Sequence, residues 1–507
     1  MELDFSRNLH YVWALLPEIV VCVGAMVVLL VGVSGQRGRG DHGTLPRSST
    51  DLGWLALGTL LLAALANGWL YGVVEVGRAG LVVVDGFRLF ANWIFLIGAA
   101  LGILVSLSYV DRQRLQAGEY YALMLFATAG MMFMAGAADL IVVFLGLEVM
   151  SIAVYALSAF NRRDRRSAEA GLKYFLLGAF STGFFLYGIA LVYGATGSTN
   201  LAAIADAVRS GSIQAPFLLI GIGLLAIGFA FKVSAVPFHM WTPDVYEGAP
   251  TPVTAFMSAT VKTAAFVAFL RVFLTGFEAV YSGWYTVLWW LAAVTMVVAN
   301  LVALVQPSVK RMLAYSSVAH GGYLLVAVTA ANETAAAGLL FYLLVYTLMN
   351  IGAFAVVLTV SRQSEENQRI EDYAGLGHHQ PALGVVLTIF LLSLAGFPGT
   401  GGFMAKIYLL QGAVDAELWT LAVILVLATV VSYYYYLRVA WYVWMRDPAR
   451  ADQHDGIHIP GATRLVLGAG VVVILILGIF PSGILDLART SVEGMMSMSS
   501  GLIGVGP

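Results

Sequence analysis

Apolar runs of about 20 residues recur along the whole chain, and they restrict its fold more than any other feature. Each run is long enough to cross the hydrocarbon core of a bilayer as a helix. Of all residues, 60% are hydrophobic and 11% are charged, which is more apolar surface than a soluble domain can bury. In lipid, each segment has to satisfy its own backbone hydrogen bonds. The sequence therefore predicts an all-α polytopic membrane protein.

Fourteen membrane spans are expected from these runs. They lie near residues 11–33, 52–73, 87–109, 120–136, 138–160, 168–194, 217–237, 251–275, 285–305, 312–331, 335–360, 382–411, 417–445 and 463–483. The chain starts Met1-Glu2-Leu3-Asp4, without the basic segment of a signal peptide. The first run is therefore expected to be retained as a helix.

Positive charges are divided unevenly between the two sides of the predicted bundle. The loops after odd-numbered spans carry sixteen lysines and arginines, and the other loops carry four. Because positive residues tend to stay in the cytoplasm, both termini are expected on the non-cytoplasmic side. The net charge of -2 gives no indication of nucleic-acid binding. The single cysteine, Cys22, excludes a cysteine-based metal centre, and no phosphate-binding loop or dinucleotide fingerprint is present.

Lysine and arginine occupy different places in the sequence. Four of the five lysines lie inside apolar runs, namely Lys173, Lys232, Lys262 and Lys406. Lys310 is interpreted as a loop charge, and nearly all of the 22 arginines lie in loops or at helix ends. Arginine stays protonated at any accessible pH, whereas a buried lysine can release its proton. The pattern predicts proton translocation, although Lys173, close to the start of its run, has snorkelling to the interface as an alternative.

Two further titratable residues lie inside apolar runs. Glu148 is the natural partner of Lys232, because a lone carboxylate in a span is expected to be neutral or paired; a static ion pair is the alternative. His320 is expected to relay protons near neutral pH, with a hydrogen-bonded core histidine as the alternative. His239, beside Trp241 at a span end, is assigned a structural or gating role.

Helix breaks and an internal repeat are expected around two of the lysines. Pro237 follows Lys232 and Pro398 precedes Lys406, and a proline in a span bends or breaks the helix. Lys406 lies 174 positions after Lys232, and His320 lies 172 positions after Glu148. An offset of about 173 would relate spans 4–8 to spans 9–13 as five-helix units, and an odd helix number inverts the second unit. A packing kink is the alternative reading of each proline.

Four regions follow from this interpretation. They are a three-helix segment (1–115), a first inverted repeat (116–276), a second inverted repeat (277–446), and a C-terminal helix with a tail (447–507).

Several sequence motifs resemble one known family. The stretch from Lys232 to Phe256 is similar to the signature of the antiporter-like subunits of respiratory complex I, and its Trp-Thr-Pro-Asp-Val-Tyr-Glu-Gly-Ala-Pro form resembles the subunit N branch. Further runs fit the same family: Gly146–Ser151, Leu172–Gly178, Val309–Ser317 and Leu394–Phe403. The resemblance covers nearly the whole chain.

This resemblance implies a fold, a location and a set of roles. Family members have fourteen helices with two inverted five-helix units, and they lie in the membrane arm of the proton-pumping NADH:quinone oxidoreductase in the bacterial cell membrane. The implied partners are other membrane-arm subunits, especially neighbouring antiporter-like ones. NADH, FMN, iron–sulfur clusters and quinone are expected in those partners and not in this chain. The implied proton relay comprises the Glu148–Lys232 pair, the central Lys262, the output Lys406, and Lys173 and His320 on the axis between them.

Two other functions stay open from the sequence. A subunit of a multisubunit cation/proton antiporter would share the lysines, although the Trp241–Tyr246 form argues against it. An inert scaffold of the membrane arm would tolerate lysine substitutions without a change in pumping per electron.

Overall fold

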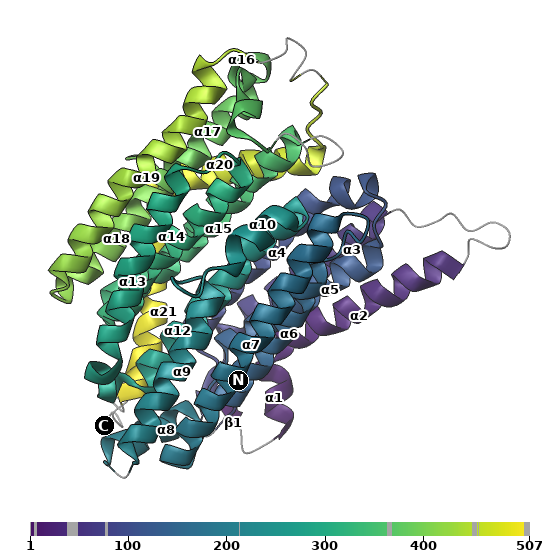
Figure 1. The fold of residues 1–507 in the computed structure, drawn as a ribbon. Helices are drawn as coiled ribbons and strands as arrows, with labels where there is room; N and C mark the ends of the chain where they lie inside the picture. The colour runs from purple at the N-terminus through teal and green to yellow at the C-terminus, as the bar shows by residue number, and fades with distance from the viewer. Residues whose placement is uncertain are drawn as a thin grey trace.

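Long helices that run side by side make up nearly the whole molecule (Figure 1). The computed structural model describes residues 2–4, 8–37, 49–76, 80–211, 213–361, 368–448, 454 and 456–500. Twelve helices within these ranges are long and apolar enough to cross a membrane. The predicted all-α polytopic architecture is therefore confirmed. Two three-residue strands that the sequence did not indicate, β1 (Glu2–Asp4) and β2 (Val74–Val76), pair in parallel.

The elements fall into consecutive groups along the chain. The N-terminal group contains α1 (Asn8–Ala14), α2 (Leu16–Arg37), α3 (Ser49–Leu70) and α4 (Gly86–Arg112). The next contains α5 (Ala117–Ala135), α6 (Leu140–Ser158), α7 (Arg165–Thr196), α8 (Leu201–Arg209), α9 (Ala215–Val233), α10 (Trp241–Gly248), α11 (Thr251–Phe256), η1 (Met257–Val261), α12 (Lys262–Arg271) and η2 (Val272–Gly276).

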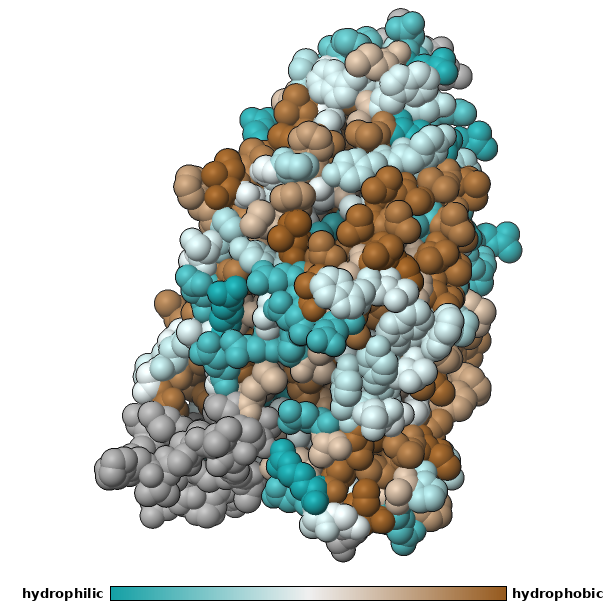
Figure 2. All heavy atoms as spheres, turned by 90° about the vertical axis from the view of Figure 1, so that its left-hand side faces the viewer, coloured by the Kyte–Doolittle hydropathy of each residue, from teal (hydrophilic) through white to brown (hydrophobic). Residues whose placement is uncertain are grey.

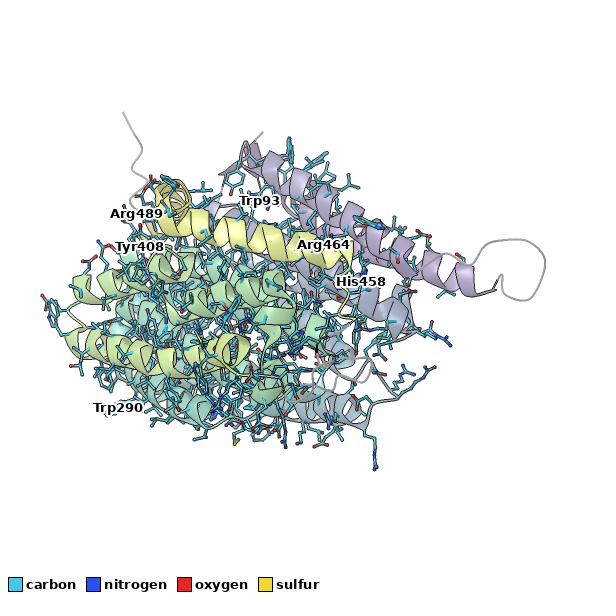
Figure 3. All side chains as sticks on the ribbon, turned by 90° about the horizontal axis from the view of Figure 1, so that it is seen from above. Trp93, Trp290, Tyr408, His458, Arg464 and Arg489 are labelled. Carbon is cyan, nitrogen blue, oxygen red and sulfur yellow. The ribbon has the colours of Figure 1, made fainter. Side chains whose placement is uncertain are left out.

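The third group has a similar order of elements. It contains η3 (Glu278–Val280), α13 (Tyr281–Leu304), α14 (Val309–Ala330), α15 (Glu333–Val360), η4 (Ile370–Tyr373), α16 (Leu376–His379), α17 (Pro381–Ala395), α18 (Gly401–Asp415) and α19 (Trp419–Met445). The chain ends in α20 (Gly461–Ile479) and α21 (Ser482–Ser500), which extends the helical structure into the region expected to be a tail. Seen from above, α20 and α21 lie along one side of the bundle, beside the N-terminal helices (Figure 3).

The twelve apolar helices coincide with twelve of the fourteen predicted spans. The predicted span 120–136 corresponds to α5, a continuous helix of 19 residues. The predicted span 382–411 is divided into α17 and α18, each of 15 residues. The total of fourteen therefore stays a prediction that depends on α5 and on the α17–α18 pair.

Two isolated β-bridges occupy matching places in the second and third groups. Asp139, the N-cap of α6, bridges Asn200, and Ser308, the N-cap of α14, bridges Arg369. Each member of the second bridge lies 169 positions after its counterpart in the first. The two groups thus share a loop arrangement, with an offset that differs from the 173 positions predicted from the lysine spacing.

Close approach of helix backbones explains several glycines in the bundle. A methyl group on Gly130 of α5 would lie 2.7 Å from the carbonyl oxygen of Gly146 of α6. Similarly, one on Gly188 of α7 would lie 2.9 Å from the carbonyl oxygen of Gly221 of α9. Small residues at such crossings are typical of membrane helices, because packing rather than the hydrophobic effect holds them together.

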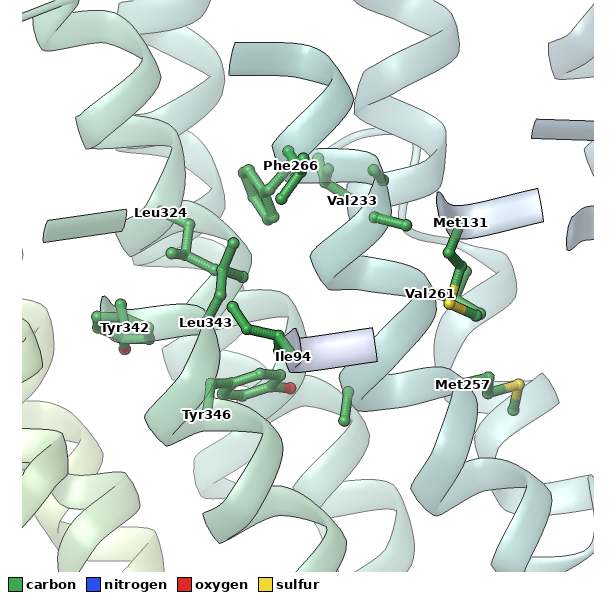
Figure 4. Packing of buried hydrophobic residues seen from close by; sticks show 14 of the residues in the cluster. Ile94, Met131, Val233, Met257, Val261, Phe266, Leu324, Tyr342, Leu343 and Tyr346 are labelled. Atoms are coloured by element: carbon green, nitrogen blue, oxygen red, sulfur yellow. The ribbon is translucent and has the colours of Figure 1, made fainter. Parts of the chain in front are cut away.

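The helices differ in how deeply they are buried in the bundle. The stretch from Thr251 to Gly276 is buried over the whole of its most apolar window, so it forms the centre of the molecule. Apolar side chains of several other helices pack around it (Figure 4), and they include Ile94 and Met131. On the outside, apolar side chains cover large parts of the face drawn in Figure 2. Such a face is suited to lipid or to other membrane subunits.

Candidate functional site

Lys232 lies on the last turn of α9, which ends where Ser234 adopts a left-handed conformation with φ 64°. Its side chain is 3% exposed, and Nζ donates to Ser151 Oγ at 2.7 Å and to Tyr155 Oη at 3.0 Å. The ammonium also lies 5.6 Å from the ring centroid of Tyr174. The C-terminal end of a helix favours a positive charge, so the helix end and the aromatic rings together can hold a protonated lysine.

The predicted Glu148–Lys232 ion pair is absent from the structure, although both residues are described. The Glu148 carboxylate accepts a hydrogen bond from Thr182 Oγ1 at 2.9 Å, and its side chain is partly exposed. Glu148 and Ser151 are both on α6, three residues apart. Because the Lys232 ammonium contacts Ser151, it lies on the same side of α6 as Glu148, about one turn away. The sequence could place both in spans but could not show that hydroxyl groups would take the place of the carboxylate.

Lys173 is not part of the buried axis. Its side chain is 42% exposed and forms ion pairs with Glu169 at 2.7 Å and Asp244 at 2.9 Å. Asp244 also pairs with Arg311 at 3.0 Å. Partial burial alone would raise the pKa of Asp244, but its hydrogen bonds with Lys173 and Arg311 outweigh that effect and lower the pKa. The expected place of Lys173 on the buried axis is therefore corrected. The alternative, in which Lys173 near a helix end extends its head group to the surface, fits the structure.

Lys262 lies at the centre of the molecule and is 1% exposed. It follows η1, a five-residue π-helical segment of the kind that often marks functional sites. Nζ donates to the backbone carbonyl oxygen of Ser317, and to Ser317 Oγ at 2.6 Å. Tyr346 Oη in turn donates to the same hydroxyl at 2.9 Å. The ammonium is therefore surrounded by neutral oxygen atoms.

His320 lies one turn further along α14 than Ser317 and is 1% exposed. Its Nδ1 is 2.5 Å from Tyr342 Oη and its Nε2 is 3.2 Å from Tyr436 Oη. Tyr436 also shares a hydrogen bond with the Ser316 hydroxyl. A tyrosine hydroxyl both donates and accepts, so either imidazole tautomer can be satisfied here.

Lys406 lies on α18, just after the second helix break. Its Nζ donates to the carbonyl oxygen of Ala395 at 2.8 Å and lies 4.8 Å from the ring centroid of Tyr323. α17 ends at Ala395 because Gly396 takes a left-handed conformation with φ 87°. The Lys406 ammonium therefore occupies the C-terminal end of a broken helix, whereas the Lys232 ammonium donates to hydroxyls of α6.

Both predicted breaks are present, and both begin before the prolines. Pro237 and Pro398 lie in the connections between the two halves of each broken span. Lys232 belongs to the helix before its break, whereas Lys406 belongs to the helix after its break. Their spacing of 174 positions therefore does not mark equivalent positions.

The interpretation of Lys310 as a loop charge is wrong. It is the second residue of α14, it is fully buried, and its Nζ donates to the carbonyl oxygen of Ala249 at 2.8 Å. A short loop before α14 made the residue look external, since the sequence does not show how closely α10 and α14 approach each other.

One face of α14 connects the groups of the second half. Ser317 contacts Lys262, His320 follows after three residues, and the ring of Tyr323 lies beside Lys406 after three more. Gly321, four residues after Ser317, lies near the same lysine: a methyl group on Gly321 would lie 2.8 Å from the carbonyl oxygen of Val233 and 3.8 Å from Lys262 Nζ. The end of α9 and the central lysine therefore meet at this helix.

The sequence reasoning missed the hydroxyl groups that contact these lysines and His320. They are Ser151, Tyr155, Ser317, Tyr342 and Tyr436. The one available signal was the spacing of Ser317, His320 and Tyr323 in an apolar run, which places three polar side chains on one helix face. In the described ranges, no group of three or more His, Cys, Asp or Glu side chains is arranged to hold a metal ion.

Comparisons with known proteins agree on one family. The model of the NADH:quinone oxidoreductase/Mrp antiporter membrane family matches residues 137–432. An NADH-quinone oxidoreductase subunit N of Trichlorobacter lovleyi is 48% identical over 482 residues, which cover 94% of this chain and 96% of the relative. An NADH-quinone oxidoreductase subunit N 1 of Sorangium cellulosum is 44% identical over 497 residues, which cover 94% of this chain and 98% of the relative.

Solved structures show the same fold. A chain of respiratory complex I from Thermus thermophilus has a TM-score of 0.78 and 35% identity, with 93% of this chain and 99% of that chain covered. A chain of the archaeal membrane-bound sulfane sulfur reductase has a TM-score of 0.83 at 26% identity, with coverage of 96% and 98%. A chain of the Mrp complex from Dietzia is similar in fold at 21% identity, with a TM-score of 0.80 and coverage of 96% and 99%.

Proposed function

We propose that this chain is the proton-translocating subunit N of a respiratory complex I. The chain belongs to the NADH:quinone oxidoreductase/Mrp antiporter membrane family, and the proposal proceeds from that membership. It is a multi-pass membrane protein with at least twelve helices suited to crossing a bilayer. Electron transfer from NADH to quinone takes place in partner subunits, and this chain carries the translocation step and no redox step. Its partners are other membrane-arm subunits, and its location is the bacterial cell membrane.

The observation that carries the proposal is the placement of three buried lysines around one helix. Lys232, Lys262 and Lys406 all lie within the bundle, and α14 or the end of α9 connects them. None of the three forms an ion pair with a residue that the structure describes. An opposite charge would favour the protonated form of a lysine, and neutral oxygen atoms do so less strongly. These lysines are therefore suited to load and release a proton.

In the proposed mechanism, a signal from the redox subunits changes the relation of Glu148 to Lys232. With the carboxylate near the ammonium, Lys232 holds its proton; with the carboxylate on Thr182, as here, that electrostatic support is weaker. The proton then passes to Lys262, along Ser317 and the His320 region, and to Lys406. The gaps between these groups are bridged by water or by small side-chain movements.

The two inverted units are part of the proposal. The shared β-bridge arrangement and the two broken helices support a repeat that relates 116–276 to 277–446, flanked by the segments 1–115 and 447–507. In such repeats, discontinuous helices form ion sites near the middle of the membrane. Lys232 lies just before the first break and Lys406 just after the second, so each unit would contribute one half of the proton path.

The experiment compares Lys232→Arg with the unmodified chain in the assembled complex. Arginine keeps the positive charge but does not release its proton, so the variant should translocate fewer protons per NADH oxidised. Proton uptake and NADH oxidation are measured together in inverted membrane vesicles. Arg163→Ala, which removes an exposed arginine, is the control and should leave the ratio unchanged. An unchanged ratio in Lys232→Arg would show that Lys232 is not a relay and would favour the scaffold alternative.

A further inference from the structure

A surface cavity of about 320 Å³ lies between α7 and α10. Its lining is strongly charged, and its residues are Arg166, Glu169, Ala170, Lys173, Asp244, Glu247 and Gly248. A methyl group on Gly248 would lie 2.7 Å from the carbonyl oxygen of Arg166, so the two helices touch at one edge of the cavity. None of these groups belongs to the buried path described above.

An aromatic pair lies on the inner side of this cavity. Tyr174 follows Lys173 on α7, and Trp241 precedes Asp244 by one turn on α10. Their rings are stacked, with centroids 4.2 Å apart and an angle of 8° between the planes. Both side chains are nearly fully buried. Trp241 Nε1 also donates to the carbonyl oxygen of Phe231, next to Lys232, at 3.1 Å.

One face of α7 leads from the cavity to Lys232. Ala170 lines the cavity, Tyr174 follows four residues later, and Gly178 follows after four more. A methyl group on Gly178 would lie 2.0 Å from Tyr155 Oη, the hydroxyl that contacts the Lys232 ammonium. The ring of Tyr174 is 5.6 Å from that ammonium. Eight residues of helix span about 12 Å. The aromatic pair therefore lies between the level of the cavity and the level of Lys232, and the ring of Phe231 stacks on Trp241 with centroids 5.4 Å apart.

Ion pairs hold α10 in place over this route. Asp244 pairs with Lys173 of α7 and with Arg311 of α14, and Glu247 pairs with Arg311 at 2.7 Å. These groups are 31–42% exposed, so water reaches them and the pairs can exchange partners with it. α10 is eight residues long and is joined to α9 by a non-helical connection, so its movement has to break the hydrogen bonds of Trp241 to Phe231 and of Thr242 to Ser234 but no hydrogen bond within α9.

We infer that this cavity is the proton entry to Lys232, that Tyr174 and Trp241 form its gate, and that the ion pairs of Asp244 hold the gate closed. The inference rests on the proposed function, because it assumes that Lys232 is loaded with protons from solution. Tyr174 and Trp241 are positioning residues here: they exclude water from Lys232 until α10 moves. Opening the stack connects the cavity to the Ser151 and Tyr155 hydroxyls, and these already contact the ammonium.

Cysteine accessibility tests the gate without any measurement of pumping. Ser151→Cys, in a Cys22→Ser background, places the only thiol of this chain beside Lys232. Vesicles that contain the assembled complex are treated with 2-aminoethyl methanethiosulfonate from the side that carries Arg166. The cysteine sulfur forms a disulfide with the reagent and methanesulfinate leaves, so the mass of the chain reports the extent of labelling.

The gate predicts a graded response. Trp241→Ala should increase the labelling rate by at least about tenfold because the barrier is removed, whereas Trp241→Phe keeps a stacked ring and should stay within about twofold. Asp244→Asn should increase the rate roughly two- to fivefold, as expected when half-exposed ion pairs are lost. Trp69→Ala, which changes a tryptophan that contacts Trp13 in a tilted pair with ring centroids 5.9 Å apart, far from this cavity in the chain, is the control and should have no effect.

Protection of the Ser151→Cys thiol in both Trp241→Ala and Asp244→Asn, in assembled complexes, would overturn the entry cavity. If the complex that carries Trp241→Ala does not assemble, the labelling rate in Asp244→Asn decides the test. Asp244→Asn removes a charge at the surface and leaves the buried packing unchanged. Faster labelling combined with normal pumping by Lys232→Arg would support the gate and overturn the relay, so the two proposals fail separately.

Discussion

Neutral oxygen atoms surround the buried lysines, and this is the residue-scale basis of the proposed conduction. Lys232 donates to two hydroxyls, Lys262 to a hydroxyl and a carbonyl, and Lys406 to a carbonyl. A buried charge without an opposite charge is costly to keep, so a small change nearby can move its proton. In contrast, Lys173 is held by two carboxylates and is suited to a structural task.

Tyr436 and Tyr435 allow a matched test of the path around His320. Tyr436 Oη contacts His320 Nε2, whereas Tyr435 Oη donates to Asn300 at 3.0 Å, and both side chains are buried. Each Tyr→Phe change removes one buried hydroxyl and should cost about 1 kcal/mol of stability. Tyr436→Phe alone should slow proton transfer, by up to roughly a hundredfold at this step. Equal rates of proton uptake in the two variants would argue against a role for Tyr436.

At the residue scale, the sequence showed which titratable residues lie inside apolar runs, but it did not show which way their side chains point. Lys232, Lys262, Lys406 and His320 stood out because titratable side chains are costly inside an apolar run. Lys173 and Lys310 were misplaced, because distance from a span end does not tell which way a side chain points. Serine and tyrosine are common in membrane helices, so their hydroxyls beside the lysines gave no comparable signal.

Broken helices and glycine crossings position these residues at the scale of elements. Lys406 donates to a carbonyl at the C-terminal end of α17, which has no partner within that helix, whereas Lys232 lies on the last turn of α9 and donates to hydroxyls of α6. The helix breaks were predictable from the prolines to within a few residues. The strands β1 and β2 were not predicted, since three residues are too few for a periodic pattern. The helix α21 was not predicted either, since an amphipathic helix does not form a continuous apolar run of the kind that identifies a membrane span.

Two glycines of α9 test the crossing that supports Lys232. A methyl group on Gly221 would lie 3.0 Å from the carbonyl oxygen of Gly188, whereas one on Gly223 would meet nothing within 4 Å. Gly221→Val should separate α7 from α9 and destabilise the chain by about 1–3 kcal/mol, as overpacking does. Gly223→Val should be close to neutral. Thermal unfolding of the purified complex measures both, and similar losses would contradict the crossing.

The whole molecule combines two similar groups of helices with extra elements at each end. The fold class and most span positions followed from the length and order of apolar runs, because the bilayer restricts the possible structures so strongly. The family followed from sequence motifs, above all the stretch from Lys232 to Phe256. The register of the proposed repeat did not follow from the lysines, since the β-bridges give an offset of 169 positions where the lysines suggested 173. Buried polar residues are placed by function as well as by symmetry, so they are poor markers of register.

The uneven distribution of lysine and arginine predicts the orientation of the whole molecule. With both termini outside the cytoplasm, a periplasmic reporter such as alkaline phosphatase should be active when fused after Pro507. A reporter that needs the cytoplasm, such as green fluorescent protein, should be dark at the same site. The opposite pattern would contradict the expected orientation, in which both termini lie on the non-cytoplasmic side.

Lys262 is the point where the two halves meet, and it provides the most direct test of proton conduction through this chain. The measurement is the number of protons translocated per NADH oxidised in vesicles whose complex carries Lys262→Ala, with Arg163→Ala as the control. The buried path predicts a lower ratio in Lys262→Ala and an unchanged one in Arg163→Ala, because the link to Ser317 is lost only in the first. An assembled Lys262→Ala complex with a normal ratio would contradict it.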